Sequence, residues 1–146
     1  MVIHPPVALA IGTIAGFGLN WLLPLPFVPS SLPRVWIGLV LFLAGILLAA
    51  WSVQTFGKAR TNVLTSQSAS TIVATGPYGF SRNPIYVAFI MMATGQFLIF
   101  PNWIPLIYLG GAAWLIHRQV LREEEFMRGH YGQAYADYCN RVRRYL

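Results

Sequence analysis

Four long apolar runs, separated by proline-rich or polar stretches, organise this chain. They extend over Val7–Leu23, Val35–Phe56, Ile85–Phe100 and Trp103–His117. At about 1.5 Å of rise per helical residue, the first two runs come close to the ~30 Å thickness of a bilayer's hydrocarbon layer. The pattern therefore predicts an all-α integral membrane protein with about four transmembrane helices.

The third and fourth runs are shorter, and only Pro101 and Asn102 separate them. A connection this brief joins antiparallel neighbours, so we expect a helical hairpin. The fourth helix is expected to continue past its apolar run into the charged residues that follow. After Gly132, tyrosines and arginines recur over 133–145, which predicts a short C-terminal amphipathic helix on the membrane surface.

The first run contains two glycines four residues apart, Gly12 and Gly16. Small residues at this spacing let two helices approach closely. The pair serves either as a packing face within the protein or as a specific dimer motif, and the spacing alone favours the packing face.

The composition supports a membrane protein. Of the 146 residues, 56% are hydrophobic and 10% are charged, whereas soluble domains average about 25% charged residues. A soluble domain of this size has too little interior to hide so much apolar surface. The net charge of +6 does not point to nucleic acid, because the basic residues lie beside the apolar runs. The single cysteine excludes an internal disulfide.

The positions of the basic residues predict the topology. Outside the apolar runs, the basic residues fall on two predicted sides of the membrane. One side carries only Arg34, and the other carries Lys58, Arg60, Arg82, Arg118, Arg122, Arg128, Arg141, Arg143 and Arg144. The positive-inside rule places the second group, and both termini, in the cytoplasm. We expect one multi-pass membrane domain, 1–146, made of two N-terminal spans (1–56), a cytoplasmic loop (57–84), the hairpin (85–122) and a cytoplasmic C-terminal segment (123–146).

The segment 70–86 is the longest polar, turn-rich passage. Pro77 and Pro84 each bias the preceding residue away from helix, and Gly76 and Gly79 permit backbone conformations and close approaches that a side chain would prevent. Such a segment is either an ordinary loop between membrane spans or a rigid backbone cradle for a ligand at the cytoplasmic face.

Three of the four acidic residues are consecutive: Glu123, Glu124 and Glu125. Successive helical positions point about 100° apart, so the three carboxylates cannot share one face. We expect Glu125 to pair with Arg118 or Arg122 on the hydrated face. A carboxylate at the level where a helix leaves the bilayer needs a cationic partner, and for Glu123 or Glu124 a bound ligand could supply that cation.

Other catalytic chemistries find little support. No two histidines have the spacing of metal ligands, so no metal site is expected. Ser81 has no base near it in the sequence, so a serine nucleophile is not indicated. The chain also lacks the glycine-rich nucleotide fingerprint of soluble enzymes.

Two motifs in the C-terminal half resemble a known signature. The first is Thr75-Gly76-Pro77-Tyr78 followed by Arg82-Asn83-Pro84-x-Tyr86, and the second is Glu123-Glu124-x-x-Met127 followed by Tyr131-Gly132, Tyr135, Tyr138, Val142 and Arg144. In this order, around a helical hairpin, they resemble the isoprenylcysteine carboxyl methyltransferase and phospholipid methyltransferase families. The resemblance covers about residues 70–146.

The resemblance implies an integral membrane enzyme that takes a methyl group from S-adenosylmethionine and transfers it to a lipid-like or small amphiphilic acceptor. The cofactor would lie between the segment 70–86 and the helix after the hairpin. By position, Ile72, Val73 and Tyr78 would line the adenosine region, Asn83, Pro84, Ile85 and Tyr86 would form the cradle, and Glu123 would meet the amino-acid end.

This sequence departs from the family pattern at two positions. Asn83 stands where the family often has histidine; an amide offers hydrogen bonds but does not accept a proton at neutral pH. Gln119 stands where the prenylcysteine enzymes have an arginine near the substrate, and Arg118 or Arg122 could take its place. Arg118, Gln119 and Arg122 are therefore the candidates for contact with the substrate. The resemblance therefore does not by itself imply an acceptor that carries a carboxylate.

Two alternatives remain open. Membrane sterol and enone reductases that use NADPH resemble the same C-terminal half, and their cofactor phosphates need several basic groups, of which the 57–84 loop offers Lys58, Arg60 and Arg82. A non-catalytic membrane scaffold of the same fold is the other alternative. The methyl acceptor, the identity of any catalytic base and the oligomeric state do not follow from the sequence.

Overall fold

The computed structural model describes residues 5–23, 31–65 and 72–146. In chain order the elements are α1 (Pro5–Leu22), α2 (Leu32–Thr65), the 3-10 helix η1 (Gly76–Gly79), α3 (Pro84–Ile99), α4 (Trp103–Tyr131) and α5 (Gln133–Arg141). The described residues are almost all helical and contain no β-strand, which confirms the predicted all-α class.

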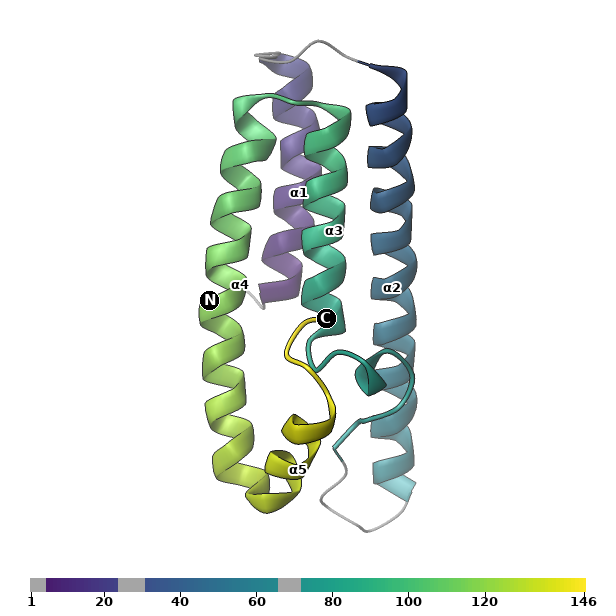
Figure 1. Ribbon diagram of the computed structural model, residues 1–146, viewed down its shortest axis with the longest axis vertical. Coiled ribbons are helices and arrows are strands. Elements are labelled where there is room, and N and C mark those ends of the chain that lie inside the picture. The colour runs from purple at the N-terminus through teal and green to yellow at the C-terminus, as the bar shows by residue number, and fades with distance from the viewer. Residues whose placement is uncertain (1–4, 24–30, 66–71) are drawn as a thin grey trace.

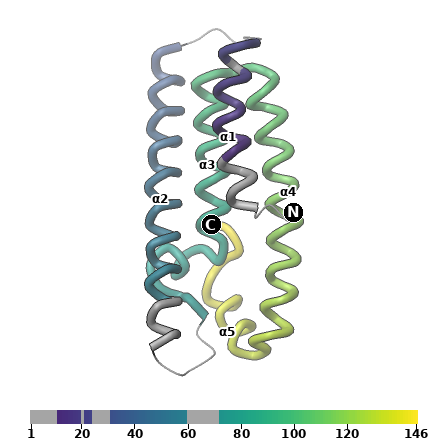
Figure 2. The backbone as a smooth tube through the Cα atoms, turned by 180° about the vertical axis from the view of Figure 1, so that it is seen from behind, coloured from purple at the N-terminus to yellow at the C-terminus, as the bar shows by residue number. Residues whose placement is uncertain are grey.

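The long helices stand side by side as a bundle (Figure 1). Helices α1 and α3 run in one direction and α2 and α4 in the other, and α1 and α3 occupy only one half of its length. In the other half, η1 and α5 lie between the extended ends of α2 and α4, and the C-terminus returns to the start of α3. The view from behind gives the same arrangement (Figure 2).

Two helices continue beyond their apolar runs. Helix α4 extends without a break to Tyr131, as the sequence predicts. Helix α2 passes Phe56, where the sequence predicts the beginning of a loop, and ends only at Thr65. The residues after Phe56 include good helix formers such as Lys58 and Ala59, so the helix has no reason to end where the apolar run ends.

Small residues bring α2 and α3 into backbone contact. A Cβ added to Gly95 would lie 2.6 Å from the carbonyl oxygen of Gly38, and one added to Gly38 would lie 2.8 Å from that of Gly95. Two turns away, a Cβ on Gly45 would lie 2.8 Å from the carbonyl oxygen of Ala88. Both pairs repeat after seven residues and so lie on one face of each helix. These glycines allow α3 to pack most extensively against α2.

The glycine pair of α1 packs inside the protein. A Cβ on Gly12 would lie 2.6 Å from the Tyr108 ring of α4, and one on Gly16 would lie 2.7 Å from Nε2 of Gln96 on α3. Next to them, Thr13 Oγ1 and Tyr108 Oη are 2.9 Å apart, and Gln96 Nε2 donates to Thr13 O at 3.2 Å. The structure thus uses the pair as a packing face, which is the alternative that the spacing favours.

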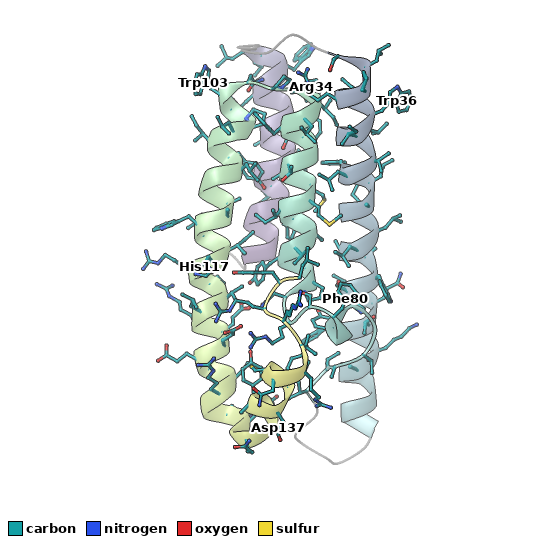
Figure 3. All side chains as sticks on the ribbon, in the orientation of Figure 1. Arg34, Trp36, Phe80, Trp103, His117 and Asp137 are labelled. Atoms are coloured by element: carbon teal, nitrogen blue, oxygen red, sulfur yellow. The ribbon has the colours of Figure 1, made fainter. Side chains whose placement is uncertain are left out.

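Large apolar side chains cover the outside of the bundle. Trp36 is 62% exposed and Trp103 is 56% exposed; both lie at the end that also carries Arg34, and Asp137 lies at the opposite end (Figure 3). Within 5–23, 31–65 and 72–146, one segment, Leu32–Ala59 of α2, is long and apolar enough to cross a membrane. Only 17% of its most apolar part is buried inside the protein, unlike the core helix of a soluble protein.

Candidate functional site

The polar site lies at the base of α3, where the segment 76–83 crosses between α2 and α4. Gly76 begins η1 with a φ of 58°, a left-handed conformation that favours glycine. A Cβ there would also lie 3.1 Å from Thr55 Oγ1 of α2. Pro84 then begins α3, where its missing N–H costs no helical hydrogen bond. Gly76 and Pro84 thus set the path of the chain into the site.

Three of the candidate residues meet at one carboxylate. The Tyr86 hydroxyl of α3 donates to Glu123 Oε1 at 2.8 Å, and Gln119 Nε2 of α4 donates to the same oxygen at 2.9 Å. Tyr86 is buried and Glu123 is half-buried. Within the described part of the chain, the ion pairs involve Glu124 and none reaches Glu123. Glu123 is therefore a partly dry carboxylate held by two neutral donors.

The neighbouring Glu124 is the centre of an ion-pair cluster. It is 4% exposed, and its two oxygens accept from Nε and Nη2 of Arg144 at 3.0 and 2.9 Å. Arg82 Nη1 lies 3.4 Å from Glu124 Oε1. Arg128 is the most exposed of the three arginines, and its Nη2 lies 4.0 Å from Glu124 Oε2. Arg82 also donates to the Cys139 sulfur. The cluster joins α4 to the segment before α3 and to the C-terminal tail.

The tail, residues 142–146, closes around the base of α3. Arg82 N donates to Arg143 O at 2.9 Å, within an isolated parallel bridge between Ser81 and Arg143. Asn83 Nδ2 donates to Arg144 O at 3.0 Å. The amide of Asn83 therefore orients the tail, while its own backbone N–H is bonded to Ser81 Oγ.

Helix α5 is amphipathic, but its apolar face is buried in the protein. Tyr135, Tyr138 and Val142 form a buried cluster against which Ile72 packs, and the Tyr138 hydroxyl donates to Tyr78 O at 2.7 Å. Burial raises the pKa of Tyr138 to about 12, so its hydroxyl keeps the proton that it donates. The prediction of a membrane-surface helix over 133–145 needs correction. The helix ends at Arg141, and its tyrosines are buried against Ile72 and against Met127 and Tyr131 of α4.

The remaining candidates lie either around the base of α3 or on the exposed surface of α4. Val73 is half-buried just before η1, Pro84 is buried, and Ile85 packs against the core formed by Tyr86 and its neighbours. Burial also raises the pKa of Tyr78 to about 12. Arg118 and Arg122, by contrast, are exposed on the outer surface of α4. Gln119 is thus the one of the three substrate candidates that contacts Glu123.

The expected pairing of Glu125 needs correction. Glu125 is exposed, as expected, but in the described residues no ion pair joins it to Arg118 or Arg122. The Arg118 guanidinium instead lies over the Trp114 ring, 4.9 Å from its centroid. The ion pairs form at Glu124, for which the sequence allowed a bound ligand as the source of the cation; Arg82 and Arg144 supply it instead. Glu124 lies on the same buried face of α4 as Ile116 and Val120, a face that the apolar positions of this helix do not single out in the sequence.

Sequence comparison identifies the class of this chain. The sequence pattern of the family described as phospholipid methyltransferase matches residues 33–134. The chain belongs to this family, which confirms the resemblance drawn from the two motifs.

Several curated relatives carry a more specific name. The protein-S-isoprenylcysteine O-methyltransferase of Xenopus laevis is 28% identical over 109 residues, which cover 73% of this chain and 38% of the relative. Form B of Arabidopsis thaliana is 24% identical over 130 residues (85% and 66%), and the enzyme of Rattus norvegicus is 28% identical over 122 residues (80% and 43%). The chain thus spans between 38% and 66% of these relatives' lengths. No solved structure matches it.

Proposed function

We propose that this protein is an integral membrane methyltransferase that transfers a methyl group from S-adenosylmethionine to a lipid-like or small amphiphilic acceptor. The observation that carries the proposal is the half-buried Glu123 carboxylate at the base of α3. It is held by Tyr86 and Gln119 and lacks a cationic partner within the described residues. Membership of a methyltransferase family supports the same reaction.

The site suits a cationic ligand group. A half-buried carboxylate without a counter-ion is costly, and an ammonium group would remove that cost. S-adenosylmethionine carries such an ammonium, and when bound it supplies a methyl group already activated by the sulfonium charge. Glu123 would hold the ammonium, and the ring faces of Tyr78 and Tyr86 can attract a cation.

The other candidate residues complete the proposed cofactor site. The apolar side chains of Ile72 and Val73, which lie beside η1, would flank the adenosine. Asn83, Pro84 and Ile85 would shape the cradle from the start of α3. With the donor activated, the protein mainly has to align donor and acceptor. Gln119, beside Glu123, would face the acceptor with a neutral amide.

We also propose that the half of the bundle formed by all four long helices lies in the bilayer. Helices α1 and α3 have 18 and 16 residues, which corresponds to about 27 and 24 Å of rise. Arg34 lies at one end and the site at the other, so the site would face the cytoplasm. Cysteines introduced at Ser31 and Ser66, in a Cys139→Ser background, should then react with impermeant reagents from opposite sides. Reaction from the same side would exclude this topology.

A ligand panel tests the function. The purified protein in detergent is heated alone, with S-adenosylhomocysteine, and with NADPH. We expect S-adenosylhomocysteine to raise the melting temperature and NADPH to leave it unchanged. The reverse result would favour the reductase alternative, and no shift with either ligand would favour a scaffold. Incubation of a membrane lipid extract with labelled S-adenosylmethionine would then identify the acceptor.

A further inference from the structure

We propose that Arg118 and Arg122 form a binding site for the phosphate of an anionic phospholipid on the outer face of α4. The site would hold α4 at a defined depth in the cytoplasmic leaflet, with the Glu123 site beside it. This inference rests on the membrane placement given above. It assigns the two arginines to the lipid surface, away from the carboxylate that Gln119 contacts.

The two arginines lie on the face of α4 opposite its packed face. Ala112, Ile116, Val120 and Glu124 are buried and recur every four residues. A residue two positions further along a helix points about 200° away. Arg118 follows Ile116 by two positions and Arg122 follows Val120 by two, and both are exposed. Their guanidinium groups therefore project from the bundle.

The same outer face is apolar toward the other end of the helix. Trp103, Ile107 and Trp114 are 56%, 70% and 58% exposed. The surface changes from apolar to basic within one helical turn, between Trp114 and Arg118. The Arg118 guanidinium lies 4.9 Å from the Trp114 ring centroid, and tryptophan favours the interface between hydrocarbon and headgroups. This boundary marks where the apolar layer ends.

The depth of the arginines fits the headgroup layer. From Trp103 to Arg122 the helix rises about 28 Å, and from Trp36 to Lys58 on α2 it rises about 33 Å. Both values are close to the ~30 Å thickness of the hydrocarbon layer. Trp36 and Trp103 lie at the same end of the bundle (Figure 3). Arg122 and Lys58 would therefore reach the lipid phosphates on the opposite side.

Charge and shape favour a phosphate as the occupant. The planar guanidinium group binds phosphate oxygens in a bidentate manner. The exposed Glu125 shares this face and lowers its net positive charge, but within the described residues no carboxylate lies within ion-pair distance of either arginine. The carboxylate of Glu124 is engaged on the opposite face. The two guanidinium groups are thus available to an anion from the membrane.

The test measures lipid selectivity in a neutral detergent. The melting temperature is followed while dioctanoyl phosphatidylglycerol or dioctanoyl phosphatidylcholine is added. We expect the unaltered protein to respond to the anionic lipid at lower concentration. In the double variant Arg118→Gln/Arg122→Gln the apparent affinity for phosphatidylglycerol should fall about tenfold. Each basic residue near an anionic surface contributes to the binding free energy, and the negative charge of Glu125 offsets part of that contribution.

Two further variants separate a specific site from a general charge effect. Arg141→Gln/Arg143→Gln removes the same charge from two exposed side chains of the C-terminal segment and should keep the preference for phosphatidylglycerol. Arg118→Lys/Arg122→Lys keeps the charge without the bidentate fork and should fall between the unaltered protein and the glutamine variant. If the glutamine variant does not fold, this lysine variant carries the test alone.

Three results would overturn the proposal. The first is an unchanged lipid preference in the glutamine variant, and the second is an equal loss in the Arg141/Arg143 control. The third is an equal stabilisation by inorganic phosphate, which would indicate a free-anion site. S-adenosylhomocysteine is titrated into the unaltered protein in the same detergent. Failure of that binding would count against the proposed function and would leave the lipid result to be judged separately.

Discussion

The backbone contact between α2 and α3 makes a sharp prediction for Gly95→Ala. The added Cβ would lie 2.6 Å from Gly38 O and 2.8 Å from Phe42 N. Carbon atoms pack favourably only at about 3.5–4.0 Å. Both obstacles are main-chain atoms, which cannot rotate away as a side chain would. The two helices would therefore have to move apart by about 1 Å along the surface where they are closest.

The expected cost follows from two opposing effects. Overpacking a close interface typically costs about 1–3 kcal/mol, while alanine is favoured over glycine in a helix by up to about 1 kcal/mol. We therefore expect Gly95→Ala to lower the free energy of unfolding by about 1–2 kcal/mol. At about 2–4 °C per kcal/mol for a chain of this size, the melting temperature in detergent should fall by roughly 2–8 °C.

Gly111→Ala on α4 is the matched control, because a Cβ at Gly111 meets nothing within 4 Å. It should leave the melting temperature unchanged or raise it slightly through helix propensity. Equal melting temperatures for the two variants would refute the close contact between the backbones. Because α3 also carries Tyr86, Gly95→Ala should weaken the binding of S-adenosylhomocysteine, whereas Gly111→Ala should not.

Three further predictions concern the site. Glu123→Gln should weaken S-adenosylmethionine binding at least tenfold, about 1.4 kcal/mol, and Glu125→Gln should change it little, because exposed charges contribute only about 0–1 kcal/mol. Arg144→Gln should lower stability by about 1–3 kcal/mol, since it removes the bidentate partner of a buried carboxylate, whereas Arg128→Gln should cost under about 1 kcal/mol. The melting temperature should fall above pH 10. The pKa of Tyr138 is raised from 10.0 to about 12 in the folded state, so its contribution to stability is complete below the unfolded pKa and is lost as the pH rises through 12. Tyr138→Phe should make this fall shallower.

Each of these has an outcome that contradicts it. Calorimetry that finds Glu125→Gln to be the damaging change would mean that the wrong carboxylate faces the cofactor. Equal losses of melting temperature in Arg144→Gln and Arg128→Gln would remove the distinction between a buried and an exposed partner. A pH dependence identical in the unaltered protein and in Tyr138→Phe would mean that this hydroxyl does not titrate with unfolding.

The approximate positions of the helices and the family could be derived from the sequence, but the ends of α2 and α5 could not. A long apolar run bounded by prolines or polar residues satisfies its backbone hydrogen bonds most simply as a helix, so the four runs indicate helices whatever their partners are. The motif around Arg82 and Asn83 is also local, because proline and glycine restrict the backbone within a few residues. Tyr86 and Glu123 were predicted from the order of the two motifs, and the structure brings them within 2.8 Å.

Other features depend on contacts between distant parts of the chain. Whether Glu123, Glu124 or Glu125 turns inward depends on the rotation of α4, since one residue changes the direction by about 100°. The apolar positions of α4 alone leave that rotation open, because large apolar residues such as Trp103, Ile107 and Trp114 also cover its exposed side. The buried face that starts at Ala112 and reaches Glu124 becomes visible only when α3 packs against it.

The position of the C-terminal tail against the base of α3 depends on tertiary contacts alone. Asn83 bonds to the backbone of Arg144, 61 residues further along the chain, and Arg144 bonds to Glu124, 20 residues before it. No local propensity specifies such pairs, because asparagine, arginine and glutamate side chains are also well solvated at an exposed position. They form because the packing of the long helices places the base of α3, α4 and α5 close together, and because a buried carboxylate among them requires cationic partners.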